Sequence, residues 1–141
     1  MERTVATSAF YKIVNEVKNS TLYLNNWMVY IMEQLLLLTG QINDYWVPVP
    51  IDEIDCIESM QKKVWFYSGN ERFRTKFTLK ELADRLPSNF IRTHRSCIIN
   101  IRSISRVSKD YMNNYQIQLK NGVCMPISQS YLADTRMHLQ L

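Results

Sequence analysis

Glycine, proline and cysteine are all scarce in this 141-residue sequence, and each shortage excludes a class of protein. Three isolated glycines cannot form the glycine-rich loop that holds nucleotide phosphates. With only four prolines beside them, no flexible linker or low-complexity segment is present. Three cysteines, without a CxxC pair, do not suggest a disulfide framework. We therefore expect reduced thiols in a cytosolic protein.

A secretory leader and a long apolar run are also missing. The first residues, MERTVATSAF, contain no apolar stretch followed by a small-residue cleavage site. The strongest apolar run, from Trp27 to Leu38, contains Glu33 and is shorter than the roughly 20 residues of a transmembrane helix. We expect a cytoplasmic protein without a membrane partner.

Residues with catalytic or metal-binding chemistry form no recognisable set. His94 and His138 lack the paired ligand spacing of zinc sites, and no nucleophile elbow or triad order accompanies Cys97. Acidic side chains gather around one predicted strand: Asp52, Glu53, Asp55 and Glu58. We interpret them as a solvated face or as partners of nearby arginines. The sequence thus predicts no enzyme, no cofactor, no metal and no small-molecule substrate.

The sequence does have an uneven distribution of charge. It carries 17 basic and 13 acidic residues, of which 3 basic and 4 acidic fall in residues 1–46. Residues 47–141 therefore hold 17 − 3 = 14 basic residues against 13 − 4 = 9 acidic ones. This excess is compatible with an anionic partner for the C-terminal part, and equally with a basic soluble domain.

Residues 1–46 follow a helical period and are predicted to form an N-terminal helical segment. In its second half the apolar residues step by four and three, as in a heptad seam: Leu24, Met28, Ile31, Leu35, Leu38 and Ile42. A helical hairpin of this size cannot bury so much apolar surface alone. We expect it to pack on a second copy, as a homodimer, or else on the rest of the chain.

A domain boundary is placed near residue 46, where the period changes from helical to alternating. Pro48 and Pro50 indicate an extended connector or an edge strand. Alternating runs predict strands around residues 54–58, 64–67, 72–77, 115–119 and 123–127.

Turn and capping residues complete the second part of the chain. Thr78 and Glu81 form a capping box that predicts a short helix, which Pro87 ends. Asn121-Gly122 between two alternating runs predicts a hairpin, and Ser128 is placed to cap a last helix. Residues 47–141 are therefore expected to be an α+β domain of mainly antiparallel sheet.

One segment, residues 90–102, concentrates side chains suited to DNA. Polar side chains lie there within eleven residues, around several apolar isoleucines: Arg92, His94, Arg95, Asn100 and Arg102. Arginine matches phosphates and guanine, and asparagine pairs with adenine. A buried strand with outward-pointing arginines explains the same composition, so the segment's chemistry leaves both readings open.

The segment reads FIRTHRSCIIN and resembles the signature of the LytTR DNA-binding family, F-x-R-x-H-R-S-[aromatic]-[aliphatic]-[aliphatic]-N. It departs from the signature at Cys97, where the family usually has an aromatic residue. Three further stretches match in order: IDEIDCIES, FTLKELADRLPSNF and LKNGVCMPISQSYL. The resemblance covers about residues 47–141 and implies a mostly antiparallel fold that reads the major grooves of double-stranded DNA with loops.

The resemblance also implies three DNA-contacting loops, whose residues are carried over by position. The first loop holds Lys62 and Lys63, and the second, at the end of the signature, holds Asn100. The third begins the last helix at Gln129, where the family often has arginine. Glutamine prefers adenine and arginine guanine, so the departure predicts a different base preference there.

Other residues of the signature are given roles beside these loops. Arg95 and Arg102 are expected to contact phosphates, although Arg95 could pair with an internal carboxylate. His94 is expected to be satisfied within the fold and Arg92 to form a surface ion pair. For Asn100, capping a turn is the alternative to contacting DNA.

The predicted function is a DNA-binding transcription regulator. It is response-regulator-like but without a receiver domain, because 46 residues are too few for a receiver's α/β sheet. The alternative is a protein-interaction module or anti-activator that acts through the N-terminal helices.

Overall fold

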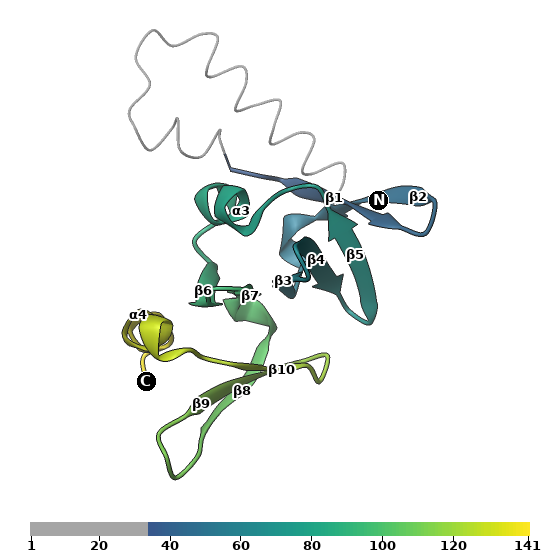
Figure 1. Ribbon diagram of the computed structural model, residues 1–141. Helices are drawn as coiled ribbons and strands as arrows, with labels where there is room; N and C mark the ends of the chain where they lie inside the picture. Colours follow the sequence, from purple (N-terminus) through teal and green to yellow (C-terminus); the bar gives the residue numbers. More distant parts are fainter. Residues whose placement is uncertain (1–33) are drawn as a thin grey trace, which may run out of the picture.

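The computed structural model describes residues 34–141, which form two antiparallel sheets and two α-helices (Figure 1). The strand order is β2-β1-β5-β4-β3-β7-β6 in the larger sheet and β10-β9-β8 in the smaller one. Every strand pair in both sheets is antiparallel. The expected fold class, mainly antiparallel sheet with short helices, is confirmed.

The elements have the following bounds. The larger sheet contains β1 (Leu37–Ile42), β2 (Tyr45–Pro50), β3 (Cys56–Met60), β4 (Lys63–Ser68), β5 (Glu71–Thr75), β6 (Phe90–His94) and β7 (Cys97–Asn100). The smaller sheet contains β8 (Ile104–Lys109), β9 (Tyr115–Leu119) and β10 (Cys124–Pro126). The helices are α3 (Leu79–Arg85) and α4 (Gln129–Leu139), and the 3₁₀ turns are η1 (Ile51–Glu53) and η2 (Ile101–Ser103).

Two hydrophobic clusters hold these elements together. In the first, Phe66 of β4 stacks on Phe73 of β5 with ring centroids 5.1 Å apart, and Leu82 of α3 is buried in the same cluster. In the second, Ile99 of β7 and Ile117 of β9 are fully buried, and apolar side chains of α4 pack against them. Helix α3 therefore belongs with the larger sheet, while α4 and the smaller sheet close over β7.

Strand β1 overturns part of the N-terminal prediction. The helix expected to run to Ile42 is wrong over Leu37–Ile42, which pair with β2 instead. Leu38 and Gly40 face the core, so these residues fit the period of a strand as well as a heptad. Gly40 has no room for a side chain: an added Cβ would collide with Phe73 and lie 2.5 Å from Phe66 Cζ.

The larger sheet therefore begins ahead of the expected boundary near residue 46. Leu35, expected in the heptad seam, is not helical, and its amide donates to the Arg85 carbonyl at the end of α3 (3.0 Å). The earlier members of the seam, and with them the expected dimer contact, lie outside the described residues.

Strand β2 lies at the edge of the larger sheet, which confirms the edge-strand interpretation of its two prolines. Pro48 pairs with Thr39 and Pro50 with Leu37, so both prolines occupy alternate positions of the same strand. Proline lacks an amide donor and is tolerated where the nitrogen faces away from the neighbouring strand.

Local sequence signals predicted most of the remaining elements, while β6 and β7 had been left open and β8 was missed. The Thr78 hydroxyl accepts from the Glu81 amide (3.2 Å), which is one half of the expected capping box, and α3 ends before Pro87. The Glu81 carboxylate accepts from the Thr78 hydroxyl (3.2 Å) and not from the expected backbone amide. Gly122 has φ +90° in the β9–β10 turn, as expected for this hairpin. Strand β8 was not predicted, because an irregularity between Ile104 and Arg106 breaks its alternation.

Candidate nucleic-acid interface

Three loops from distant parts of the chain meet at one end of the larger sheet. They are the β3–β4 turn, the β6–β7 turn and the start of α4. The Ser59 amide donates to the Ser96 carbonyl (2.8 Å), which joins the end of β3 to the β6–β7 turn. The Ser128 amide donates to the Thr93 carbonyl (3.0 Å), which joins the start of α4 to the end of β6. Backbone hydrogen bonds thus fix the relative position of the three loops.

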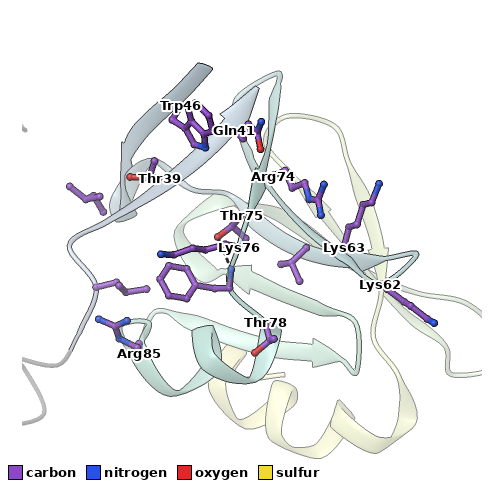
Figure 2. A pocket seen from close by; sticks show the side chains of 14 residues that line it. Thr39, Gln41, Trp46, Lys62, Lys63, Arg74, Thr75, Lys76, Thr78 and Arg85 are labelled. Carbon is purple, nitrogen blue, oxygen red and sulfur yellow. Dashed lines mark hydrogen bonds between the residues drawn. The ribbon is translucent and has the colours of Figure 1, made fainter. Parts of the chain in front are cut away.

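The β3–β4 turn presents two lysines. Met60 pairs with Lys63, so Gln61 and Lys62 alone form the turn, with φ values of +55° and +64°. Two successive left-handed residues are typical of a type I′ hairpin turn. Lys62 and Lys63 are both exposed, and within residues 34–141 neither has an ion-pair partner (Figure 2).

The β6–β7 turn holds Arg95 in an exposed position. His94 Nδ1 accepts from the Ser96 amide (3.1 Å) and lies 2.9 Å from Ser96 Oγ, which braces the turn from inside. The Arg92 guanidinium donates to the Arg95 carbonyl and lies 5.9 Å from the centre of the Tyr131 ring on α4. The turn is therefore held on both sides while the Arg95 side chain stays free to meet a ligand.

These contacts test two expected roles. His94 is satisfied within the fold, as predicted. The surface ion pair expected for Arg92 is wrong, since its partners among the described residues are a carbonyl and an aromatic ring.

The start of α4 carries Gln129, which is exposed at the first helical position. Ser128 occupies the N-cap position, but its hydroxyl makes no capping hydrogen bond, so the expected side-chain cap is wrong. The bond from the Ser128 amide to Thr93 fixes the backbone there by other means. A helix N-terminus carries partial positive charge, which adds to the cations of the two turns.

Asn100 does not belong to this surface. Its side chain is 1% exposed and makes three hydrogen bonds: it donates to the Ile54 carbonyl (2.9 Å), and it accepts from Asn89 Nδ2 (2.9 Å) and the Arg102 amide (3.0 Å). These contacts favour the turn-capping alternative, and a DNA contact by Asn100 stays a prediction.

Arg102 lies with Asn100 at the far end of β7. The strand runs from Cys97 to Asn100, which separates the β6–β7 turn from η2 by roughly 13 Å at 3.3 Å per residue. Arg102 is exposed there, on the first residues after the strand. Of the six predicted contact residues, the structure brings together Lys62, Lys63, Arg95 and Gln129 and sets Asn100 and Arg102 apart.

The chemistry of this surface is that of binding. Cys97, beside the β6–β7 turn, is buried, and this burial raises the pKa of its thiol, so the thiol stays protonated at neutral pH. Among residues 34–141 no three metal-ligating side chains gather, and no helix is long and apolar enough to cross a membrane. Exposed cations and an amide are suited to phosphates and base edges.

Sequence reasoning missed the residues that position the surface. Arg92, Tyr131 and the Thr93 carbonyl connect β6 with α4, across more than thirty positions of the chain. No pattern within a single stretch of sequence predicts these contacts, because they join β6 to the distant helix α4. The His94-x-Ser96 spacing was visible, but only the turn geometry makes it a hydrogen bond.

Known DNA-binding domains resemble this chain in sequence and in fold. The LytTr DNA-binding domain family matches residues 44–140. The chain belongs to this family. The LytTr DNA-binding domain of a Bacillus cereus protein, described as a methyl-accepting/DNA response regulator, superposes with a TM-score of 0.72 at 30% identity. The match covers 76% of this chain and 99% of that domain.

Relatives in sequence are named as regulators. The Escherichia coli transcriptional regulatory protein YpdB is 30% identical over 97 residues, and the Staphylococcus aureus transcriptional regulatory protein LytR is 34% identical over 76 residues. These matches cover 66% and 53% of this chain, and 40% and 31% of the relatives. The LytTR chain thus spans well under half the length of these relatives.

Proposed function

We propose that this LytTR protein is a sequence-specific, DNA-binding transcription regulator of the cytoplasm. Its contact surface consists of the β3–β4 turn, the β6–β7 turn and the start of α4. Lys62, Lys63 and Arg95 contact phosphates or guanine, and Gln129 reads a base edge in the major groove. The protein has no catalytic role in this proposal.

The convergence of the three loops carries the proposal. The bonds from Ser59 to Ser96 and from Ser128 to Thr93 hold the loops together before any ligand arrives. Three exposed cations and one exposed amide then share one end of the sheet. A surface organised in advance binds with a smaller loss of conformational entropy.

The proposal includes a dimer that binds two half-sites of DNA. Two copies, joined through residues ahead of position 34, would contact two half-sites about one helical turn apart.

Gln129, where arginine is frequent in the family, favours adenine over guanine at the base that it meets.

Selection of bound duplexes from a random DNA pool tests the proposal directly. Enrichment of a short motif, followed by an anisotropy titration whose affinity falls steeply with salt, is the expected result. Weak binding without enrichment of any motif would contradict the proposal and favour the protein-interaction alternative.

Replacement of Arg95 by alanine tests the surface itself. Arg95→Ala should weaken binding to the selected duplex by about 1–3 kcal/mol, because one charge-assisted contact is lost. Arg102→Ala is the matched control, since it removes another exposed arginine from the far end of β7. Equal losses for both variants in the anisotropy titration would contradict the assigned surface.

A further inference from the structure

A groove of about 760 Å³ borders the β3–β4 turn on the opposite side from the β6–β7 turn, and the proposed function does not use it (Figure 2). Strands β1, β2, β4 and β5, the segment from Lys76 to the N-cap Thr78, and the last residue of α3 form its walls. Figure 2 shows side chains from all of these elements around one hollow.

The charged side chains that line the groove are all basic. They are Lys62, Lys63, Arg74, Lys76 and Arg85. No aspartate or glutamate lies among the described lining residues. Within residues 34–141, Arg74 and Lys76 have no ion-pair partner, so their charges act on whatever enters the groove.

Apolar side chains occupy the same walls. Trp46 and Leu37 are 65% and 41% exposed, and Phe77 lies 5.6 Å from the Lys76 ammonium group, measured to the ring centre. Exposed tryptophan and leucine next to cations do not suit a phosphate backbone, which offers no apolar surface. They suit a peptide that carries both carboxylates and apolar side chains.

We propose that this groove binds an acidic peptide segment of a partner protein, with leucine- or phenylalanine-like side chains against Trp46 and Leu37. Carboxylates of the segment pair with Arg74 and Lys76. Lys62 and Lys63 line the groove and also belong to the proposed DNA-contacting surface. A bound segment therefore competes with DNA for these two lysines, a consequence that rests on the proposed function.

Charge complementarity selects this occupant over the chain's own N-terminal segment. Residues 1–33 are electrically balanced, with three basic and three acidic side chains: Arg3, Lys12, Lys18, Glu2, Glu16 and Glu33. A neutral segment gains little from five cations, whereas an acidic one gains in both affinity and association rate.

The test uses the full chain and a labelled peptide of about ten residues in which aspartate and glutamate alternate with leucine and phenylalanine. We expect saturable binding in fluorescence anisotropy, and loss of binding when the acids are replaced by asparagine and glutamine. Lys76→Glu should weaken peptide binding about tenfold or more. Lys80→Glu, the same change on the exposed face of α3 outside the groove, should leave it within about twofold.

DNA binding provides an independent readout. Lys76→Glu should leave affinity for the selected duplex nearly unchanged, while the peptide should displace DNA from the unmodified chain. Failure of the peptide to bind a chain that binds DNA would overturn the groove proposal alone. Peptide binding by a chain that binds no DNA would support the groove and overturn the proposed function.

Two further results would also overturn the proposal. The first is a loss of DNA affinity in Lys76→Glu that grows as the duplex is lengthened, which would assign the groove to flanking DNA. The second concerns a photo-crosslinking residue in place of Thr39, which lines the groove. Capture of residues 1–33 of the same chain, in place of the peptide, would make the N-terminal segment the occupant.

Discussion

Residues of one short signature perform opposite tasks in this LytTR domain. Arg95 is exposed at the β6–β7 turn, whereas Asn100, five positions later, is buried and makes three side-chain hydrogen bonds. The motif is therefore partly a loop of the proposed DNA-contacting surface and partly a structural clamp between β7, η2 and the chain ahead of β3. Residue type alone could not separate the two, because asparagine serves equally well in either task.

Asn100→Ala is expected to lower the free energy of unfolding by about 1–3 kcal/mol, because the Ile54 carbonyl and the Arg102 amide lose buried partners. Urea denaturation of the purified full chain measures this change. Asn89→Ala, which removes a single one of the three bonds, should cost less. A variant of unchanged stability that no longer binds DNA would return Asn100 to the role of a base-reading residue.

Gly40→Ala is expected to destabilise the protein by about 1–3 kcal/mol or more, because the new methyl group overlaps Phe73 and Phe66 in a packed core. Thermal unfolding gives the measurement. Thr39→Ala, on the exposed face of the same strand, should change stability by about 0.5 kcal/mol or less. Similar losses at both positions would mean that β1 does not approach the two rings as closely as described.

At the scale of elements, the β3–β4 turn has an unfavourable backbone conformation and carries an exposed lysine. Gln61 and Lys62 both have positive φ, for which asparagine and glycine are the preferred residues. A turn selected for stability alone would contain those residues. The proposed DNA contact gives a reason for a lysine at this position.

Lys62→Gly should therefore raise the free energy of unfolding by about 0.5–1 kcal/mol while it weakens DNA binding. The slope of log affinity against log salt should flatten by about one unit, as expected for one lost phosphate contact. Gln61→Asn is the control, since it relaxes the turn and keeps the charge. If Lys62→Gly left the salt slope intact, Lys62 would not be a phosphate contact.

Helices and strands that are marked by a capping or turn residue in the sequence were predictable. Elements whose conformation is decided by packing against distant residues were not. The Thr78 capping box and the Asn121-Gly122 turn each specify their own geometry, so α3 and the β9–β10 hairpin appeared in the right places. β1 was assigned to a helix because Leu38 fits both periods, and only packing against Phe66 decides between them. β8 was missed because its irregularity hides the alternation.

At the scale of the whole molecule, the buried thiols make stability dependent on alkaline pH. Burial, with smaller effects from the charges of Asp55 and Glu58, raises the pKa of Cys56 well above its ordinary value of 9.0. The folded protein therefore keeps a proton that the unfolded chain loses. Stability is complete below about pH 9 and falls as the pH rises further.

The expected slope is up to about 1.4 kcal/mol per pH unit for each such thiol, measured by denaturant titrations between about pH 8 and pH 10.5. Cys56→Ala should make the slope shallower. Cys124→Ala should not, because Cys124 is exposed and lies in the smaller sheet. An unaltered slope in Cys56→Ala would assign the effect to other groups.

The convergence of the three loops is a property of the whole molecule that sequence reasoning reached only through family resemblance. Lys62, Arg95 and Gln129 are separated by more than thirty positions from one another. Their meeting depends on the pairing of β3 with β7 and on the bond from Ser128 to Thr93. Such long-range pairings have no signature in any single stretch of the chain.

The two prolines of β2 have a consequence for the protein at high concentration. An unpaired strand edge can recruit the edge of another molecule and start an ordered aggregate. Pro48 and Pro50 remove two amide donors from one edge of the larger sheet, while α4 packs beside β6 at the other. Copies at high concentration would thus meet through their surfaces without joining their sheets, so that each copy stays able to dissociate.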